Sequence, residues 1–434
     1  MSLCYPVRLM KFIVRHKLRW LTSPSVALAF GESFFRLLGM RCKGREIDLL
    51  SQVKRVLIVR LDEIGDVVMT TPFLRELRRN LPDAWMTLVV KPAVYNLVER
   101  CPYVDEVLTY DWSVAWTKRA SLVKVTRHSR AIRLALKRLW WRNFDLAILP
   151  RFDIDYYHGN FLAYFSLARW RVGYSEDVTE DKRIVNKGSD RLLTHPVKVS
   201  NHIHEVERNL DLIRFLGGTV GSSRLETWLS TEDERVAENV LTSNGVNPVK
   251  DTVIAFCLGA GQAKRIWPVD RFIKVARWVK EKYSAMIIVI GGKDESGLGH
   301  RLRQEIGENV VNMAGRTTLR ETTALLKRCV LYVGNDTGPM HIAAAVGTPV
   351  VGIFCHPLDG DPLHSNSPAR FGPWKVFSCI VQPHVPMSPC SDACMDYKPH
   401  CILNVSVEQV CEAISIQLDT VLKKRRERIQ ENSL

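Results

Sequence analysis

Residues 333–346 read VGNDTGPMHIAAAV, and this stretch is central to the fold that we expect. Before it, Cys329 to Val333 form an apolar run typical of a buried parallel strand, and the small apolar residues 342–346 are typical of a helix. The first backbone N–H groups of a helix have no partner within the helix and lie at the positive end of its dipole. The stretch therefore predicts a phosphate site at a strand-to-helix turn.

The same alternation of apolar strands and amphipathic helices extends to both sides of this stretch. In the first half of the chain we expect a helix from Val67 and strands at 56–59, 86–90, 105–110 and 145–149. In the second half we expect helices at 268–283, 299–306, 319–327 and 338–346, and strands at 252–258, 286–290, 310–313, 329–333 and 350–354. Alternating strands and helices predict parallel sheets, so the fold class is α/β with two Rossmann-like, doubly wound domains.

A segment rich in Gly, Ser and Thr, residues 219–230, is typical of a linker between these two halves. We therefore divide the chain into a basic leader (1–50), an N-terminal domain (51–222), a C-terminal domain (223–405) and a final basic helix (406–434). The leader mixes basic and apolar residues without a long apolar centre, which is typical of an interfacial amphipathic segment. The final helix either packs back across the linker or remains a solvated tail.

The composition limits the classes of partner and compartment. A formal net charge of +15 over 434 residues predicts attraction to an anion: nucleic acid, a membrane surface, or an acidic or phosphorylated substrate. No recognised nucleic-acid-binding motif accompanies the charge, so we expect no nucleic-acid partner. The 11 cysteines are odd in number and scattered, which favours reduced thiols in a cytosol. No apolar run approaches the ~20 residues that span a bilayer. We expect a cytoplasmic protein that attaches peripherally to the inner-membrane surface.

The turn after the first strand, LDEIGDVV at 61–68, contains the first candidate for chemistry. A dinucleotide-binding turn would show GxGxxG, and the single glycine here argues against NAD or FAD. Asp66 stands at the start of the following helix, directed into an interdomain cleft. It is either an N-cap residue or a general base that accepts a proton from a substrate hydroxyl. A helix N-terminus favours the ionised carboxylate, which suits a base at neutral pH.

A strongly basic helix is expected at 117–142, with nine bases and no acidic residue. Its basic residues are Lys118, Arg119, Lys124, Arg127, Arg130, Arg133, Lys137, Arg138 and Arg142, and its expected buried stripe is Leu122, Val125, Ile132, Leu136 and Leu139. The charge run is either a solvated face or a surface for an anionic partner. Arg151 follows the strand at 145–149, at the end where open α/β sheets place ligands.

Two loops of the second half carry groups suited to phosphate. The first is LGAGQAKRIWP at 258–268, where Gly259 allows close backbone approach and Lys264 and Arg265 supply cations.

The second is the opening stretch itself. Thr337 and Gly338 supply backbone N–H groups, and the Thr337 hydroxyl can also donate to a phosphate. Asp336 either binds a sugar hydroxyl or caps the helix, and His341 is either a donor or a packed histidine.

The tail also contains cysteines and histidines: Cys390, Cys394, Cys401, His384 and His400. Zinc sites need four ligands and commonly use paired short spacings such as CxxC. The spacings here do not follow that pattern, so we expect packed thiols and no bound metal.

Three motifs together resemble glycosyltransferase family 9, the lipopolysaccharide heptosyltransferases. They read VLIVRLDEIGDVVMTTPFLRELR at 56–78, GAGQAKRIWPVDRF at 259–272 and YVGNDTGPMHIAAAVGTPVVGIF at 332–354. Their order and spacing agree with the family over roughly residues 53 to 412. The resemblance implies a GT-B architecture, with the active site between an acceptor domain and a nucleotide-sugar domain. It implies transfer of a heptose from ADP-heptose to the acidic inner core of lipopolysaccharide, with inversion, without a cofactor and without a bound metal.

Carried over by motif, the resemblance makes Asp66 the catalytic base and Lys264 or Arg265 the cation that faces the phosphates. It assigns the donor-binding loop to Asp336, Thr337, Gly338 and His341, beside Gly259, and the donor ribose to Glu295. The family usually has lysine two residues before the Trp-Pro pair, where this chain has Arg265, so either cation remains open.

For the acceptor, we expect Arg127, Arg130 and Arg151 to hold a phosphorylated or carboxylated glycan or glycolipid. Two alternatives remain beside heptose transfer: a transferase that uses another nucleotide sugar, and a non-catalytic nucleotide-sugar-binding protein.

Overall fold

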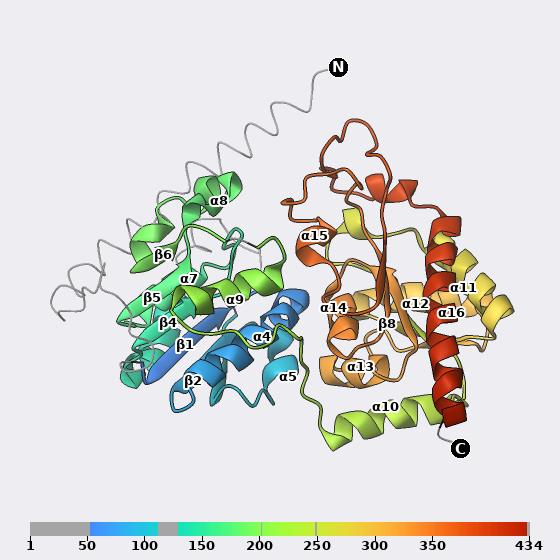
Figure 1. Cartoon of the computed structure of the whole chain (residues 1–434), viewed down its shortest axis with the longest axis horizontal. Coiled ribbons are helices and arrows are strands. Elements are labelled where there is room, and N and C mark those ends of the chain that lie inside the picture. The colour runs from blue at the N-terminus through green and yellow to red at the C-terminus, as the bar shows by residue number, and fades with distance from the viewer. Residues whose placement is uncertain (1–52, 112–128, 201, 248–249, 432–434) are drawn as a thin grey trace.

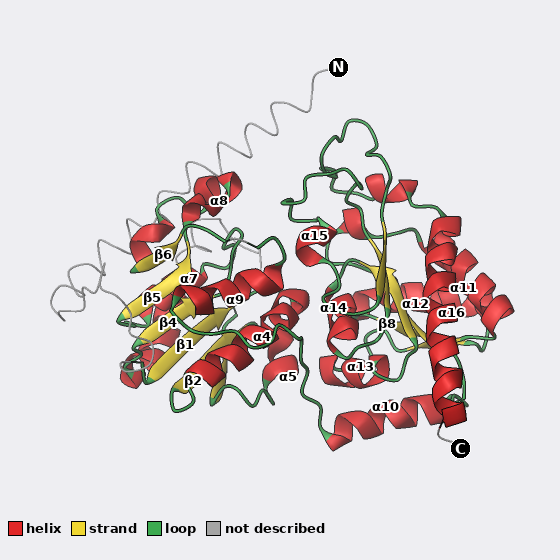
Figure 2. Cartoon of the chain, in the orientation of Figure 1, coloured by secondary structure: helices red, strands yellow, loops and turns green. Residues whose placement is uncertain are grey.

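The computed structural model describes residues 53–111, 129–200, 202–247 and 250–431. Within them the chain folds into two α/β domains, each built on a parallel sheet of six strands (Figure 1; Figure 2). The predicted basic leader lies outside the described residues, as does Arg127.

The N-terminal domain follows the expected alternation. Its strands are β1 (Arg55–Arg60), β2 (Trp85–Val90), β3 (Glu106–Thr109), β4 (Leu146–Leu149), β5 (Trp170–Tyr174) and β6 (His195–Val197). Its helices are α4 (Ile64–Asn80), α5 (Tyr95–Val98), α7 (Gly159–Phe165), α8 (Glu180–Val185) and α9 (Glu205–Phe215). Alternate residues of β1 pack to opposite faces: Val56 and Ile58 join the cluster that includes α4, and Leu57 and Val59 join the cluster that includes α7. The sheet is therefore covered on both sides, as its continuous apolar strands predict.

The C-terminal domain repeats this plan. Its strands are β7 (Val253–Cys257), β8 (Met286–Ile290), β9 (Val310–Asn312), β10 (Leu331–Asn335), β11 (Val350–Ile353) and β12 (Ser378–Val381). Its helices are α10 (Thr231–Ser243), α11 (Val269–Tyr283), α12 (Ser296–Ile306), α13 (Leu319–Leu326), α14 (Gly338–Ala345), α15 (Pro368–Phe371) and α16 (Val407–Glu431). A short 3-10 turn, Ala263–Arg265, lies in the loop after β7.

The two sheets have equivalent strand orders, β3-β2-β1-β4-β5-β6 and β12-β11-β10-β7-β8-β9. In each domain the first strand therefore lies beside both the second and the fourth, and all the pairs are parallel: Ile58 of β1, for example, pairs with Leu88 and with Ile148. Ligands of such sheets bind at the carboxyl ends of the strands, where the order reverses. The strand order therefore points to the turns after β1, β4, β7 and β10.

Three strands lie outside the expected set: β5, β6 and β12. Strand β5 was missed because it contains a charged residue, Arg171, although all five of its residues are buried. The Nε of Arg171 donates to the carbonyl of Leu192 at 2.7 Å and its Nη1 to that of Ala168 at 2.8 Å, so the buried guanidinium is satisfied. The strand β6 has only three residues, one of them proline, and β12 is a partly exposed edge strand.

The described part of the basic helix, residues 129–142, differs from the expected stripe. Its buried residues are Ala131, Ala135 and Leu139, whereas the expected Ile132 and Leu136 are 37% and 43% exposed. The prediction was wrong at these two positions because the segment Ala135–Leu139 forms a π-helical turn. A π turn takes more than four residues, so every fourth residue keeps facing the core.

The final helix, α16, packs on the C-terminal domain beside α11, β11 and β12, and not across the linker. Its buried residues include Val410, Ile414 and Leu418, which join the core cluster of that domain. Among the described residues, none of the helices has the length and apolar character needed to cross a bilayer.

The linker is attached to α4 along much of its length. Arg75 donates to the carbonyls of Ser222 at 2.7 Å and Arg224 at 3.0 Å. The buried carboxylate of Glu76 accepts a hydrogen bond from the N–H of Gly221 at 2.7 Å. Helix α4 therefore holds the start of the interdomain connection.

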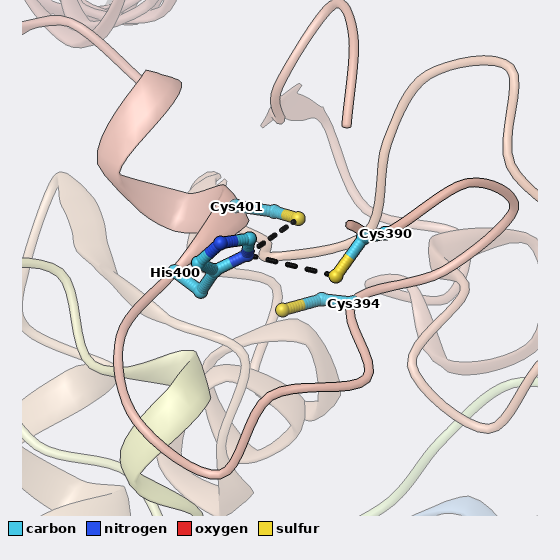
Figure 3. A group of neighbouring side chains, drawn as sticks. All are labelled: Cys390, Cys394, His400 and Cys401. Atoms are coloured by element: carbon cyan, nitrogen blue, oxygen red, sulfur yellow. Dashed lines mark hydrogen bonds between the residues drawn. The ribbon is translucent and has the colours of Figure 1, made fainter. Parts of the chain in front are cut away.

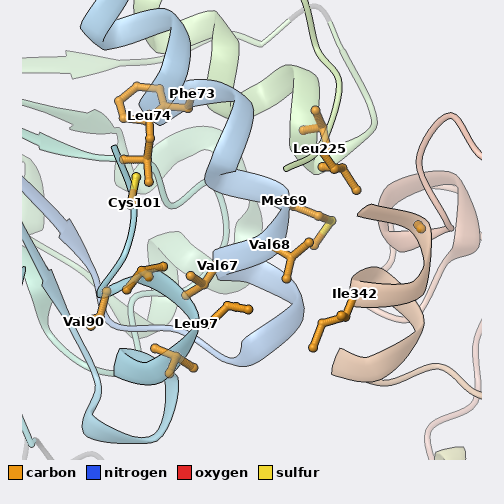
Figure 4. Close-up of a cluster of buried hydrophobic side chains, with 14 of the residues drawn as sticks. Val67, Val68, Met69, Phe73, Leu74, Val90, Leu97, Cys101, Leu225 and Ile342 are labelled. Carbon is orange, nitrogen blue, oxygen red and sulfur yellow. The ribbon is translucent and has the colours of Figure 1, made fainter. Parts of the chain in front are cut away.

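Apolar side chains continue this contact across the two domains. Figure 4 shows Ile342 of α14 facing Val68 and Met69 of α4, with Leu225 of the linker nearby. All four belong to one buried cluster that draws on both domains. The two domains are thus packed together at the middle of the molecule, beside the ends of β1 and β10.

Candidate functional site

The first residues of α4 and α14 meet between the domains. A Cβ on Gly65 would lie 2.5 Å from Cδ2 of His341, and a Cβ on Gly338 would lie 2.7 Å from Cβ of Ile64. Both distances are shorter than real Cβ contacts allow, so the absence of a Cβ at these two glycines lets the domains pack this closely. This contact brings the turn after β1 against the turn after β10.

Asp66 is the third residue of α4, next to this contact. The N-cap position that was one interpretation of Asp66 belongs to Glu63, because the helix begins at Ile64. Oδ2 of Asp66 accepts a hydrogen bond from the N–H of Glu63 at 3.3 Å, as in a capping box. The Asp66 side chain keeps 17% of its surface exposed, which leaves it accessible to a bound molecule.

A second carboxylate and two arginines surround Asp66. Its Oδ1 lies 3.3 Å from Nη2 of Arg60 and 3.9 Å from Nη1 of Arg151. Asp62 binds the same two arginines, at 3.2 and 2.5 Å. Burial raises the pKa of Asp66 and the charge of Asp62 raises it further, against the opposing effect of Arg60 and Arg151. The helix N-terminus was expected to favour ionisation, whereas burial is the largest influence on Asp66 and raises its pKa.

In the C-terminal domain, Asn335 ties the two expected phosphate loops together. Its Nδ2 donates to the carbonyls of Leu258 at 2.9 Å and Gly259 at 3.2 Å, and its Oδ1 accepts from the N–H of Trp267 at 3.0 Å. The side chain is fully buried. Sequence reasoning did not single out this residue, although a polar residue at the end of an apolar strand is a usable signal.

Glu295 lies directly over the first of these loops. A Cβ on Gly259 would lie 2.0 Å from Oε1 of Glu295, so any larger residue there would displace the Glu295 side chain. Oε2 accepts a hydrogen bond from the N–H of Gly292 at 2.6 Å. Burial raises the pKa of Glu295, which the N–H of Gly292 opposes and the charge of Asp294 reinforces. The structure thus brings Glu295 and Gly259 together, at the ends of β8 and β7.

The two cations of the loop point to different partners. Nη1 of Arg265 forms an ion pair with Oδ2 of Asp336 at 3.0 Å, whereas Nζ of Lys264 donates to the carbonyl of Cys394 at 3.1 Å. Oδ1 of Asn366 also accepts from Arg265, at 2.6 Å. Burial raises the pKa of Asp336 and the charge of Arg265 opposes this rise. Of the two cations, Arg265 is the one that reaches the α14 turn.

The start of α14 retains unused donors. Thr337 is its N-cap residue but makes no side-chain capping bond, and Pro339 in the first turn has no N–H. In the described part of the chain, the N–H groups of Thr337 and Gly338 form no hydrogen bond. His341 is buried against α4, its Nδ1 has no partner, and burial lowers its pKa to about 3. It is therefore a neutral, packed histidine at the domain contact.

The three residues expected to hold the acceptor lie in different places. Arg151 lies in the Asp66 network, where it binds Asp62. Arg130 lies on the exposed face of the basic helix, where its Nη1 is 3.9 Å from Oδ2 of Asp111. Arg127 is outside the described residues.

Part of the basic charge of this helix is neutralised within the domain. Arg142 donates to Glu106 at 2.5 Å, and Arg138 lies 3.5 Å from the same carboxylate. This carboxylate, Glu106, belongs to β3, which precedes the helix, so the absence of acids inside the helix overstated its free charge.

A buried ion-pair network across the two domains was also missed. Arg370 of α15 binds Oδ2 of Asp153 at 3.1 Å and Oε1 of Glu205 at 2.6 Å. Arg208 shares Glu205 at 2.8 Å. The sequence places Asp153 at the end of β4, but no local pattern marks an arginine more than 200 residues later as its partner. This network holds α15 against the N-terminal domain.

Comparison with known proteins shows the family to which the chain is similar. The family profile for glycosyltransferase family 9 (heptosyltransferase) matches residues 133–399, which is more than half of the chain. The lipopolysaccharide core heptosyltransferase OpsX of Haemophilus influenzae is 20% identical over 330 residues, covering 76% of this chain and 84% of that protein.

Two solved structures are similar in fold. A glycosyltransferase family 9 protein from Veillonella parvula superposes with a TM-score of 0.68 at 22% identity, covering 86% of this chain and 98% of that one. E. coli ADP-heptose LPS heptosyltransferase II superposes with a TM-score of 0.60 at 17% identity, covering 85% and 99%. The two parallel sheets and their interleaved helices match this GT-B architecture, as expected from the sequence. The chain therefore belongs to glycosyltransferase family 9, the heptosyltransferase family, and is a glycosyltransferase of GT-B fold.

Proposed function

We propose that this protein transfers a heptose from ADP-heptose to an acidic glycan or glycolipid, such as the inner core of lipopolysaccharide, with inversion at the anomeric carbon. One observation carries the proposal: the start of α4, with Asp66, meets the start of α14, with its unused N–H groups, across the domain contact. A base from one domain is thus next to a phosphate site from the other.

The donor half of the site consists of the loops after β7 and β10. The N–H groups of Thr337 and Gly338, at the positive end of α14, are suited to the pyrophosphate. Arg265 supplies the facing cation and is preferred over Lys264, whose ammonium group is turned to a backbone carbonyl. Glu295, held over Gly259 at the strand ends, is suited to accept hydrogen bonds from the ribose hydroxyls.

The reaction then needs a base and a stabilised leaving group. Asp66 takes the proton of the acceptor hydroxyl, whose oxygen attacks the anomeric carbon from the side opposite the diphosphate, and ADP leaves. The raised pKa of Asp66 brings its basicity closer to the operating pH than that of an ordinary aspartate. Arg265 and the α14 dipole provide the positive charge that the departing diphosphate requires, so the proposed transfer uses no metal ion at this site.

The acceptor is proposed to be acidic because basic groups lie on the acceptor side. Arg151 borders Asp66, Arg130 lies on the exposed basic helix, and the whole chain carries a net charge of +15. Such a surface also favours attachment to an anionic membrane, so we propose a cytoplasmic protein that works at the inner-membrane surface. The relatives support this choice: OpsX is a lipopolysaccharide core enzyme, and E. coli heptosyltransferase II is an ADP-heptose enzyme.

The test is a donor screen followed by a transfer assay. Calorimetric titration with ADP-heptose, ADP-glucose, UDP-glucose and GDP-mannose should show tightest binding of ADP-heptose, and heptose should then appear on heptose-deficient lipopolysaccharide. NMR of the product gives the anomeric configuration. Tighter binding of a UDP or GDP sugar would contradict the donor, and binding without any transfer would indicate a non-catalytic binding protein. Arg265→Gln should weaken donor binding by about tenfold, corresponding to one lost charge-assisted contact, and Lys264→Gln by less.

A further inference from the structure

A cluster of three thiols and one imidazole lies in the C-terminal domain. Cys390, Cys394, His400 and Cys401 converge in the long loop between β12 and the final helix, as Figure 3 shows. One ligand atom from each residue lies within 4.8 Å of all the others. The sequence analysis named these four residues, here called the Cys3His cluster, together with His384, but their spacings do not form CxxC pairs, so we expected packed thiols.

The distances within the Cys3His cluster match tetrahedral metal coordination. Nδ1 of His400 lies 3.6 Å from Sγ of Cys390 and 3.5 Å from Sγ of Cys401. An ion bound at about 2.3 Å from sulfur and about 2.0–2.1 Å from nitrogen, with tetrahedral angles, separates those two atoms by about 3.5 Å. The observed spacing is therefore what a shared central ion requires.

The surroundings of the Cys3His cluster also suit a closed metal site. Cys394 and Cys401 are fully buried in the apolar core of the domain. The N–H of Met395 donates to Sγ of Cys390 at 3.4 Å, which helps to fix the position of this sulfur. Four protein ligands leave no open position, which is the pattern of structural sites and not of catalytic ones.

We propose that Cys390, Cys394, His400 and Cys401 bind one zinc ion that fixes this loop. The loop from 382 to 400 has no helix or strand of its own. A metal that joins its middle, at Cys390 and Cys394, to its end, at His400 and Cys401, would remove much of its conformational freedom. The fixed loop supplies the Cys394 carbonyl that accepts the hydrogen bond from Lys264. The ion would therefore stabilise the loop after β7 indirectly, through this hydrogen bond, without contacting a substrate. This departs from the expectation that the chain binds no metal.

The test uses the full-length protein, purified under reducing conditions without chelator. Metal analysis should give about one zinc ion per chain, as expected for one four-ligand site. After chelation and loading with Co²⁺, the protein should show the strong ligand-field bands of tetrahedral cobalt bound to thiolates. Iron in place of zinc would overturn the identity of the ion while supporting the four-ligand site.

Variants locate the site. The double variant Cys390→Ser/Cys394→Ser should lose at least nine-tenths of the metal. Cys411→Ser, which changes a half-buried cysteine of α16 outside the cluster, should keep it. If the reduced wild-type protein holds no metal and takes up no Co²⁺, or if the native protein has a disulfide among these cysteines, the proposal is wrong. The wild-type measurements decide this even if the double variant does not fold, and they do not depend on the proposed transferase activity.

Discussion

Replacing Asp66 by Asn tests the proposed base with little change in shape. The amide oxygen can still accept from the N–H of Glu63, so the start of α4 should persist. What the variant loses is the ability to take a proton from the acceptor hydroxyl. A general base typically contributes a factor of about 10² to 10⁴ in rate, which corresponds to about 2.7 to 5.4 kcal/mol of transition-state stabilisation. We therefore expect kcat to fall by that factor.

Stability should not fall with it. Burial raises the pKa of Asp66, so the folded state binds its proton more tightly than the unfolded state does. Its contribution to stability is therefore full below the unfolded pKa and is lost as the pH rises through the folded pKa. At neutral pH the ionised Asp66 does not stabilise the fold, and Asp62 remains to pair with Arg60. The Asp66→Asn variant should have an unfolding free energy equal to or above that of the wild type, within about 1 kcal/mol.

The assay separates binding from chemistry. Donor affinity is measured by calorimetry and single-turnover transfer by the appearance of labelled product, with Asp83→Asn, an exposed aspartate in a surface turn, as the charge-matched control. Donor affinity should change less than twofold in both variants, and only Asp66→Asn should lose transfer. A variant that keeps more than a tenth of the wild-type single-turnover rate would refute the base assignment.

The pH profile gives a second view of the same group. The wild-type kcat/KM should fall on acidification, with an apparent pKa above the ordinary aspartate value of 3.8, because burial raises the pKa of Asp66. The residual activity of Asp66→Asn should lack this limb. An acid limb that survives the substitution unchanged would belong to another group.

Two further predictions concern the glycines that admit their neighbours. Gly259→Ala should displace Glu295, since the new Cβ would lie 2.0 Å from Oε1, and should weaken donor binding at least tenfold by calorimetry. Gly261→Ala, at a position with open space around it, should have no such effect. Equal donor affinities of the two variants would contradict the packing of this loop. Gly65→Ala should push the two domains apart, since its Cβ would lie 2.5 Å from Cδ2 of His341. The variant should lose about 1–3 kcal/mol of unfolding free energy, the usual cost of overpacking. The second substitution His341→Ala should restore part of that loss in chemical denaturation; a double variant whose loss equals the sum of the single losses would show that the two residues do not interact.

Much of the C-terminal domain could be predicted because its local signals agree with the fold. The strand β8 matches the expected bounds Met286 to Ile290, and α14 begins at Gly338 as expected. Strand β8 is an apolar run followed by Gly291, and α14 begins with Gly338 and Pro339 before small apolar residues, so burial and turn chemistry point to the same answer. The strand-to-helix turn after β10 was predictable for the same reason, and its role as a phosphate site stays a prediction.

The parts that could not be predicted depend on long-range contacts. Nothing near Lys264 indicates that it turns to the Cys394 carbonyl while Arg265 pairs with Asp336. The rise in the pKa of Asp66 comes mainly from burial in the folded chain, which a helix-dipole argument on one segment does not include. Arg171 shows the same limit for secondary structure, because its partners are carbonyl groups of neighbouring turns.

The attachment of the linker to α4 determines how the domains can move. Ser222 and Arg224 are hydrogen-bonded to the helix that carries Asp66, and the N–H of Glu226 donates to Thr71 of the same helix. Trp228 then packs edge-on against Tyr103, so the segment is held by the N-terminal domain almost to the start of α10. A short flexible connection allows only a narrow range of relative domain orientations, whereas a linker that was flexible over the whole segment would allow a wide range. If the domains open, they would close again along nearly the same path, and the start of α4 would return to the same place against the start of α14.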